Sequence, residues 1–169
     1  MRGKGGIRDK IEHFTQYIRK CLNLSSPVNM FDVMQALNIN CNPVEKVDYD
    51  AKLAGNEEEG YCIYYDKNQI SERQQFSIAH ELGHLLLHKI KSADSHEIYY
   101  RRIGNNSRLE WEANEFAASL LMPREEFINI CMNNADAFGN IDLNVIANNF
   151  GVSKQAARVR GSVLKLWVM

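Results

Sequence analysis

Phe76–His88 reads FSIAHELGHLLLH, and this stretch decides how the whole sequence is interpreted. It contains three histidines at a strict interval of four residues, His80, His84 and His88. That interval places side chains one above another on the same face of an α-helix. Two imidazoles from successive turns can converge on one Zn²⁺ ion, with metal–nitrogen distances of about 2.0–2.1 Å. The stretch therefore predicts a helix that carries a metal site.

Glu81 completes the pattern H-E-x-x-H with His80 and His84. In this pattern the carboxylate takes a proton from a metal-bound water and delivers it to a leaving amine. The five-residue pattern alone also occurs by chance in proteins that bind no metal. Here it lies in an apolar helix, where burying two histidines and a glutamate without a metal would cost several kcal/mol. We therefore interpret the stretch as the centre of a metal-dependent hydrolase, with Glu81 as the catalytic base.

His88 is not expected to bind the same ion. On an unbroken α-helix it lies about 12 Å from His80 along the axis, at a rise of about 1.5 Å per residue. The metzincin pattern does not fit either, because it needs Gly and His where this sequence has Leu87 and Ile90. We expect His88 to support a ligand, to serve a structural role, or simply to lie at the helix end, where a cationic histidine is favourable.

A third protein ligand must come from another part of the chain, as in zinc sites with two histidines and a glutamate. Glu110 is favoured, because small or short residues follow it on its predicted helix and let two helices approach closely. Asn114, one of them, is placed to hydrogen-bond a liganding histidine. Glu112 remains an alternative ligand, and Glu110 could instead only cap its own helix. The other candidate ligands are Asp94, His96, Glu97 and Glu115.

Hydrophobic periodicity and turn residues divide the rest of the chain into helices and a few strands. The segment GYCIYYD (60–66) is the clearest strand, and less regular β-like residues around Pro43 precede it. Ser71 is expected to cap the histidine helix, because Ser71-x-x-Gln74 has the capping-box form. The predicted class is α+β, mostly helical with a small β-sheet beside the histidine helix. Helices are predicted over residues 7–22, 30–37, 71–90, from 107, from 123, and in two short pieces between 142 and 160.

The two short C-terminal helices have the outline of a helix-turn-helix. Asp142 and Ser153 are predicted N-caps, and Gly151 is predicted to turn the chain between the helices. Basic and amide side chains of the second helix could contact DNA phosphates and base edges. The competing interpretation is a tail that packs on the catalytic core or docks the substrate. The residues expected to point outward are Lys154, Gln155, Arg158 and Arg160.

Composition and charge exclude several classes of protein. The 20 basic and 21 acidic residues give a net charge of −1, so no global field attracts the chain to nucleic acid or an anionic membrane. The chain has no apolar run approaching the length of about 20 residues that a membrane span needs. Its four cysteines form no C-x-x-C pair, and its basic start is followed by an amphipathic rather than an apolar segment. We expect a cytoplasmic protein with reduced thiols.

The pattern IAHELGHLLLH (78–88), followed about thirty residues later by EWEANEFAASLLMP (110–123), resembles the ImmA/IrrE family of zinc metallopeptidases. The C-terminal IANNFGVSKQAARVR is also similar to the helix-turn-helix-like segment of that family. The resemblance implies that His80, His84 and Glu110 bind one zinc ion, with Glu81 as the catalytic base. It also implies a gluzincin-like fold in the zincin class, with a metallopeptidase domain over 1–135 and a C-terminal helical segment over 136–169 that packs on it or is appended to it.

The resemblance further implies a biological role. Members typically cleave a helix-turn-helix repressor encoded beside them, which induces a mobile element, such as a prophage, or a stress response. We therefore expect a protease that acts in transcriptional regulation. The strand 60–66 could offer its edge to an extended peptide, which favours a peptide substrate over a smaller amide. The alternative is that this strand is internal or faces the core. The alternative functions are a zinc-containing regulatory or DNA-binding protein with little or no peptidase activity, and a zinc hydrolase of a smaller amide.

Overall fold

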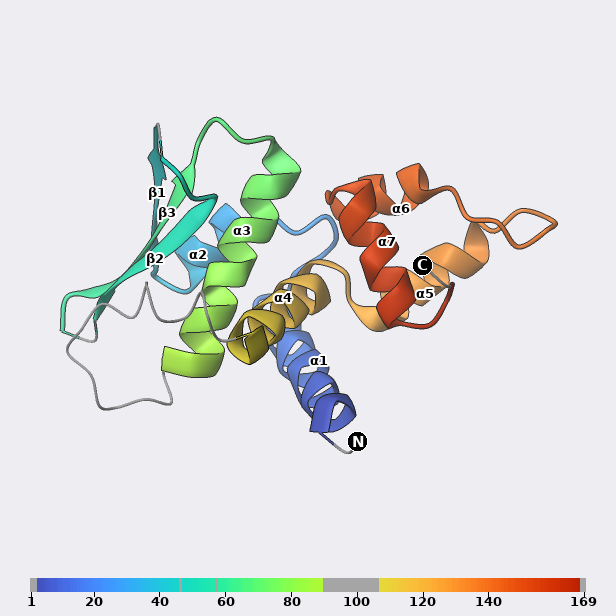
Figure 1. Ribbon diagram of the computed structural model, residues 1–169, viewed down its shortest axis with the longest axis horizontal. Coiled ribbons are helices and arrows are strands. Elements are labelled where there is room, and N and C mark those ends of the chain that lie inside the picture. Colours follow the sequence, from blue (N-terminus) through green and yellow to red (C-terminus); the bar gives the residue numbers. More distant parts are fainter. Residues whose placement is uncertain (1–2, 46, 57, 90–106, 168–169) are drawn as a thin grey trace. The chain divides into compact units, whose positions relative to one another are not determined.

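The computed structural model describes residues 3–45, 47–56, 58–89 and 107–167 (Figure 1). Helices dominate these residues and a single three-stranded sheet accompanies them, which confirms the predicted α+β class. None of the described helices is long and apolar enough to cross a membrane. The elements are α1 (Gly3–Cys21), α2 (Met30–Ala36), β1 (Asn40–Val44), β2 (Ala51–Asn56), β3 (Gly60–Asp66), α3 (Ser71–His84), the π-helical turn η1 (Leu85–Lys89), α4 (Ser107–Leu121), α5 (Arg124–Asn133), α6 (Leu143–Phe150) and α7 (Lys154–Val163).

The chain forms two compact units. One is the continuous segment Asn29–Ala117, and the other combines Met1–Val28 with Ala118–Met169. The first unit contains the sheet, α2, α3 and most of α4, whereas the second contains α1 and the helices from α5 onward. The boundary after residue 135 that we predicted from the sequence divides the chain differently and stays a prediction.

The sheet of the first unit has the strand order β1-β3-β2. β3 pairs in parallel with β1 and antiparallel with β2, which places Leu53 opposite Ile63. The predicted strand GYCIYYD is thus confirmed, and of its two possible places, at an edge or inside the sheet, it takes the internal one. Its β-branched and aromatic residues suit a central strand that pairs with a neighbouring strand along each edge. Pro43 lies in β1, at an edge of the sheet, where a missing N–H group does not interrupt the ladder.

Apolar side chains join α3 to the sheet. Leu53 and Ile63 from the strands are buried, and so are Ile78 and Leu82 from α3. Figure 1 shows α3 running alongside the three strands, and residues of α3 contact both β2 and β3. This packing fixes the helix that carries the histidines against a rigid support.

The two ends of α3 differ from the prediction. The N-cap is Ile70, which makes no side-chain capping bond, and Ser71 is already helical. Gln74 does not reach back to cap the helix; its amide donates to the carbonyl of Gln69, 2.9 Å away, in the turn before α3. At the other end the helix does not continue as a regular α-helix to Ile90. It widens at Leu85–Lys89 into the π-helical turn η1, which contains His88.

In the second unit, the predicted caps of the helix-turn-helix-like pair are confirmed. The side chain of Asp142 accepts from the N–H of Asn144 at 2.8 Å, and that of Ser153 accepts from the N–H of Ala156 at 3.1 Å. Gly151 ends α6 in the left-handed conformation with a φ of 61°, which glycine adopts without strain. The local sequence therefore determines both helix starts and the turn between them.

The prediction that Arg160 points outward is wrong. Its side chain is 1% exposed and lies 2.7 Å from the carboxylate of Glu12 on α1, in an ion pair. Its Nε also donates to the carbonyl of Met122 at 3.0 Å, just beyond the end of α4. Arg160 shares a buried face of α7 with Ala157 and Gly161, so helical position overrides the usual exposure of an arginine. Lys154, Gln155 and Arg158 are exposed as predicted.

Candidate metal centre

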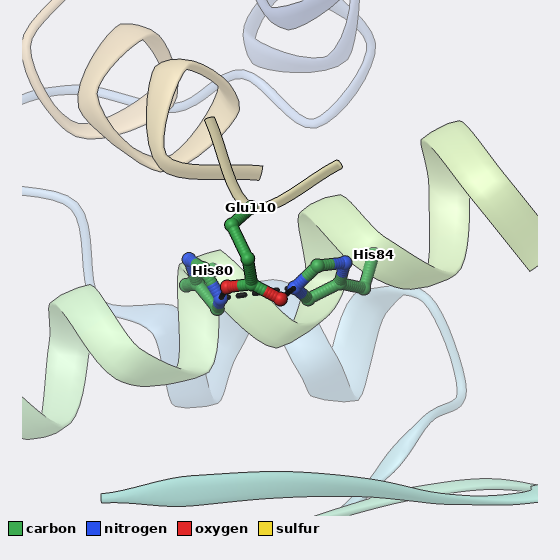
Figure 2. Close-up of side chains that lie close together, drawn as sticks. All are labelled: His80, His84 and Glu110. Carbon is green, nitrogen blue, oxygen red and sulfur yellow. Dashed lines mark hydrogen bonds and ion pairs between the residues drawn. The ribbon is translucent and has the colours of Figure 1, made fainter. Parts of the chain in front are cut away.

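Two helices of the first unit bring His80, His84 and Glu110 together (Figure 2). The two histidines come from successive turns of α3, and their Nε2 atoms lie 3.0 Å apart. Glu110, in the first turn of α4, places Oε2 3.3 Å from Nε2 of His80 and Oε1 3.3 Å from Nε2 of His84. One nitrogen or oxygen donor from each residue therefore faces a common point.

Gly83 makes this arrangement possible. A Cβ atom at this position would lie 3.2 Å from both the Cα and the carbonyl oxygen of Ala113, and 3.1 Å from the ring of Phe116. The backbone of α3 therefore lies directly against α4, three residues beyond Glu110. The absence of a side chain at Gly83 and the small side chain of Ala113 allow the approach, which confirms our expectation of a close helix contact at this face.

The donor set fits a metal ion. Four ligands at about 2.0–2.1 Å in a tetrahedron are roughly 3.3 Å from one another, close to the separations observed between the three donors. Two imidazoles and one carboxylate are also the donors found in catalytic zinc sites. The side chain of His84 is 5% exposed and that of His80 17%, whereas that of Glu110 is 33% exposed. The two histidines are therefore the more buried part of the group, and the carboxylate of Glu110 is the part most exposed to solvent.

Burial keeps the two imidazoles in the form that binds metals. It lowers the pKa of His84 to about 3, with further lowering from the neighbouring His80 and His88. It also lowers the pKa of His80, although the carboxylate of Glu110 and the amide of Asn114 oppose the effect. A neutral imidazole offers a lone pair, whereas a protonated ring would have to lose its proton first.

Glu81 follows His80 directly on α3, and its side chain contacts the sheet. Its Oε2 accepts a hydrogen bond from the backbone N–H of Leu53 on β2, at 3.0 Å. The sequence offered no signal for this contact, because every residue except proline has an N–H group and its direction depends on strand pairing. The carboxylate of the residue that follows His80 is therefore held against β2, at an edge of the sheet.

The family model that matches the chain is Peptidase_M78, described as the IrrE N-terminal-like domain, and the match covers residues 35–162. The chain belongs to this family. A search of curated proteins found no match. The resemblance noted in the sequence is thereby confirmed, and with it the metallopeptidase class. The match to the IrrE N-terminal-like family includes all the residues of the candidate metal centre, the whole of α6, and α7 except its last residue, Val163.

Two residues predicted to support the ligands lie where a supporting role requires them. Asn114, in this member of the IrrE N-terminal-like family, places Oδ1 3.0 Å from Nδ1 of His80. His88 places Nδ1 3.1 Å from Nδ1 of His84. In both ligand rings the nitrogen remote from the candidate metal therefore has a partner. Such partners fix the tautomer and the orientation of a liganding histidine.

The geometry favours Glu110 over Glu112 as the third ligand. Oε2 of Glu112 lies 3.2 Å from Nε2 of His88, and its Oε1 accepts from Nε of Arg108 at 2.9 Å. Glu112 thus faces His88 rather than the three converging donors. Glu115 is buried and does not belong to the donor group either. The remaining candidates, Asp94, His96 and Glu97, lie outside the described residues.

Proposed function

We propose that this member of the IrrE N-terminal-like family is a zinc-dependent metalloendopeptidase that cleaves a partner helix-turn-helix repressor at a specific site. The observation that carries the enzymatic part is the convergence of His80, His84 and Glu110, with Glu81 next to His80 in the sequence. The choice of substrate rests on the resemblance of the paired motifs. Cleavage of the repressor would induce a mobile element or a stress response from within the cytoplasm.

In this proposal each residue has a separate task. His80, His84 and Glu110 would hold one Zn²⁺. The bound ion supplies Lewis acidity, which lowers the pKa of a coordinated water and polarises the scissile carbonyl. Glu81 accepts the proton of the attacking water and passes it to the amide nitrogen as the C–N bond breaks. The N–H of Leu53 holds the carboxylate of Glu81 in place before the substrate arrives.

The position of β2 supports a peptide as the substrate. The N–H of Leu53 faces Glu81, so it is not used in the ladder with β3. Because the groups of an antiparallel strand alternate in direction, Ala51 also directs its backbone N–H and C=O groups to this outer side. No described strand pairs with that side of β2. An extended peptide that adds there as a fourth strand would place its backbone next to Glu81.

The decisive experiment uses Glu81→Gln, with Glu72→Gln in the first turn of the same helix as the matched control. Each protein is loaded with zinc and incubated with the helix-turn-helix repressor encoded beside its gene. We expect Glu81→Gln to bind zinc and to fold like the parent protein, but to cleave at least about 100-fold more slowly, because it lacks the base. Glu72→Gln should cleave normally. Mass spectrometry of the fragments should identify one cleavage site.

The same experiment can contradict the proposal. If cells carrying Glu81→Gln still induce the response undiminished, the protein acts as a regulator and not through proteolysis. Removal of zinc with a chelator should abolish cleavage, and addition of zinc should restore it. Cleavage that persists in the metal-free protein would refute the assignment of His80, His84 and Glu110.

A further inference from the structure

A chain of polar side chains leads away from His84 on the side remote from the candidate metal. Its first link joins Nδ1 of His84 to Nδ1 of His88 at 3.1 Å. Nε2 of His88 then lies 3.2 Å from Oε2 of Glu112. The last link runs from Nε of Arg108 to Oε1 of Glu112 at 2.9 Å. Four side chains from α3, η1 and α4 are thus connected in series.

The chemistry of the groups permits one arrangement of protons when a metal is bound. If Nε2 of His84 binds the ion, the proton of that ring is on Nδ1 and is donated to Nδ1 of His88. His88 then carries its own proton on Nε2 and donates it to the carboxylate of Glu112. Arg108 can only donate, and it occupies the other carboxylate oxygen. Each of the three contacts therefore joins one donor to one acceptor.

The local helix geometry is adapted to this chain. His88 lies in η1, where the helix departs from regular α geometry, and such π-helical turns are frequent at functional sites. The rings of His84 and His88 have their centroids 5.3 Å apart. The side chains of His88 and Glu112 are 10% and 13% exposed, so solvent contributes little to their hydrogen bonding.

Glu112 provides a charged end to the chain. Its Oε1 accepts from Nε of Arg108, and its Oε2 lies 3.2 Å from Nε2 of His88. An ionised carboxylate accepts hydrogen bonds about twice as strong as those of neutral acceptors. A carboxylate that acts through an imidazole therefore orients that imidazole firmly.

We propose that Glu112 and His88 are positioning residues for the metal centre, which fix the ring and tautomer of His84 and so strengthen metal binding. This inference rests on the proposed zinc site. Glu112 was a candidate ligand from its position in the sequence. The inference instead makes it a residue that acts on the ligand His84 through His88. Arg108 contributes less, because its side chain is 70% exposed.

The test measures zinc affinity by competition with a chelator. The variants are Glu112→Gln, His88→Leu and His88→Gln, with Glu125→Gln at an exposed position of α5 as the matched control. We expect Glu112→Gln and His88→Leu to weaken zinc binding about 10- to 100-fold, the usual effect of removing such a partner. His88→Gln should lose less, since its amide can accept from His84 and donate to Glu112.

A double variant shows whether Glu112 acts through His88. In the His88→Leu background, Glu112→Gln should cause less than about a twofold further loss, because the link is already broken. Cobalt absorption spectra of the single variants should change relative to the parent protein, whereas thermal unfolding of the metal-free proteins should change little. His88→Asn, which is polar but too short to reach both partners, replaces His88→Leu if the leucine variant does not fold.

Three results would overturn the inference. The first is a zinc affinity of Glu112→Gln equal to that of Glu125→Gln. The second is that Glu112→Gln weakens zinc binding in the His88→Leu background by the same factor as in the parent protein. The third is a parent protein that binds no zinc, and this result alone would also refute the proposed function. If the parent protein binds zinc and the variants bind it equally well, only the positioning roles are refuted.

Discussion

His80 and His84 differ in the group that each Nδ1 atom meets. His80 meets the amide oxygen of Asn114, which can only accept, so the proton of that ring is fixed on Nδ1 by one contact. His84 meets another imidazole, which can accept or donate, and therefore depends on what lies beyond it. The same type of ligand is thus oriented directly in one case and through a neighbour in the other.

We predict that Asn114→Leu weakens zinc binding about tenfold or more, because His80 loses its acceptor. Asn114→Asp should retain most of the affinity, since a carboxylate oxygen replaces the amide oxygen. Chelator competition measures both values, and circular dichroism of the metal-free proteins checks the fold. Equal affinities for Asn114→Leu and the parent protein would show that His80 needs no partner.

The sequence predicted the positions of single site residues on one helix better than it predicted other features of the structure. The intervals within one helix determine which side chains share a face, so His80 and His84 could be placed together without a structure. The small residues after Glu110 correctly indicated a close helix contact. Leu53 could not be predicted, since its contribution is a backbone N–H that becomes available only because β2 lies at the end of the sheet.

Among the elements, the contact between α3 and α4 determines the geometry of the metal centre. Gly83 lies against the backbone of Ala113, and the carboxylate of Glu110 is three residues away along α4. A backbone neighbour cannot rotate out of the way as a flexible side chain can. The distance between these two helices therefore sets the distance between Glu110 and the histidines.

We predict that Gly83→Ala lowers both thermal stability and zinc affinity. Alanine favours a helix by up to about 1 kcal/mol over glycine, but its Cβ would displace α4 and with it Glu110. Gly6→Ala on α1 is the matched control, because nothing lies within 4 Å of the added Cβ there, and it should leave zinc affinity unchanged and raise stability slightly. A Gly83→Ala protein that is more stable and binds zinc normally would contradict this account.

Strand order, unlike strand existence, was beyond prediction from the sequence. The composition of GYCIYYD identified β3 as a strand, but it could not reveal that β1 and β2 cover both of its sides. Register and order depend on contacts between segments, whereas composition reports only local preference. For the same reason the sequence left open whether β3 offers an edge to a peptide, and the structure leaves that possibility to β2.

For the molecule as a whole, Arg160 connects segments that are far apart in the sequence. It pairs with Glu12 on α1 and donates to the carbonyl of Met122 after α4. Arg19 acts similarly from α1, donating to the carbonyl of Leu120 at 2.8 Å. The sequence analysis placed Arg160 on the outside because the residue is charged. Its partner, Glu12, lies on α1, and no local sequence pattern relates α1 to α7.

We predict that Arg160→Met lowers the free energy of unfolding by about 3–5 kcal/mol, since it leaves the buried Glu12 without its partner. The double variant Arg160→Met with Glu12→Leu should recover much of that loss, because no unpaired charge remains. Urea denaturation of the metal-free proteins measures both. If the double variant is as unstable as the single one, packing and not the charge explains the loss.

The second unit joins the first helix of the chain to its last ones, with the whole segment Asn29–Ala117 inserted between them. During synthesis on the ribosome, the inserted segment can acquire its structure as soon as it emerges. The helix α1 is made earlier but must wait for partners such as Leu120 and Arg160. Its apolar residues Ile11 and Ile18, buried in the finished protein, stay exposed until then and are available to chaperones in the interval.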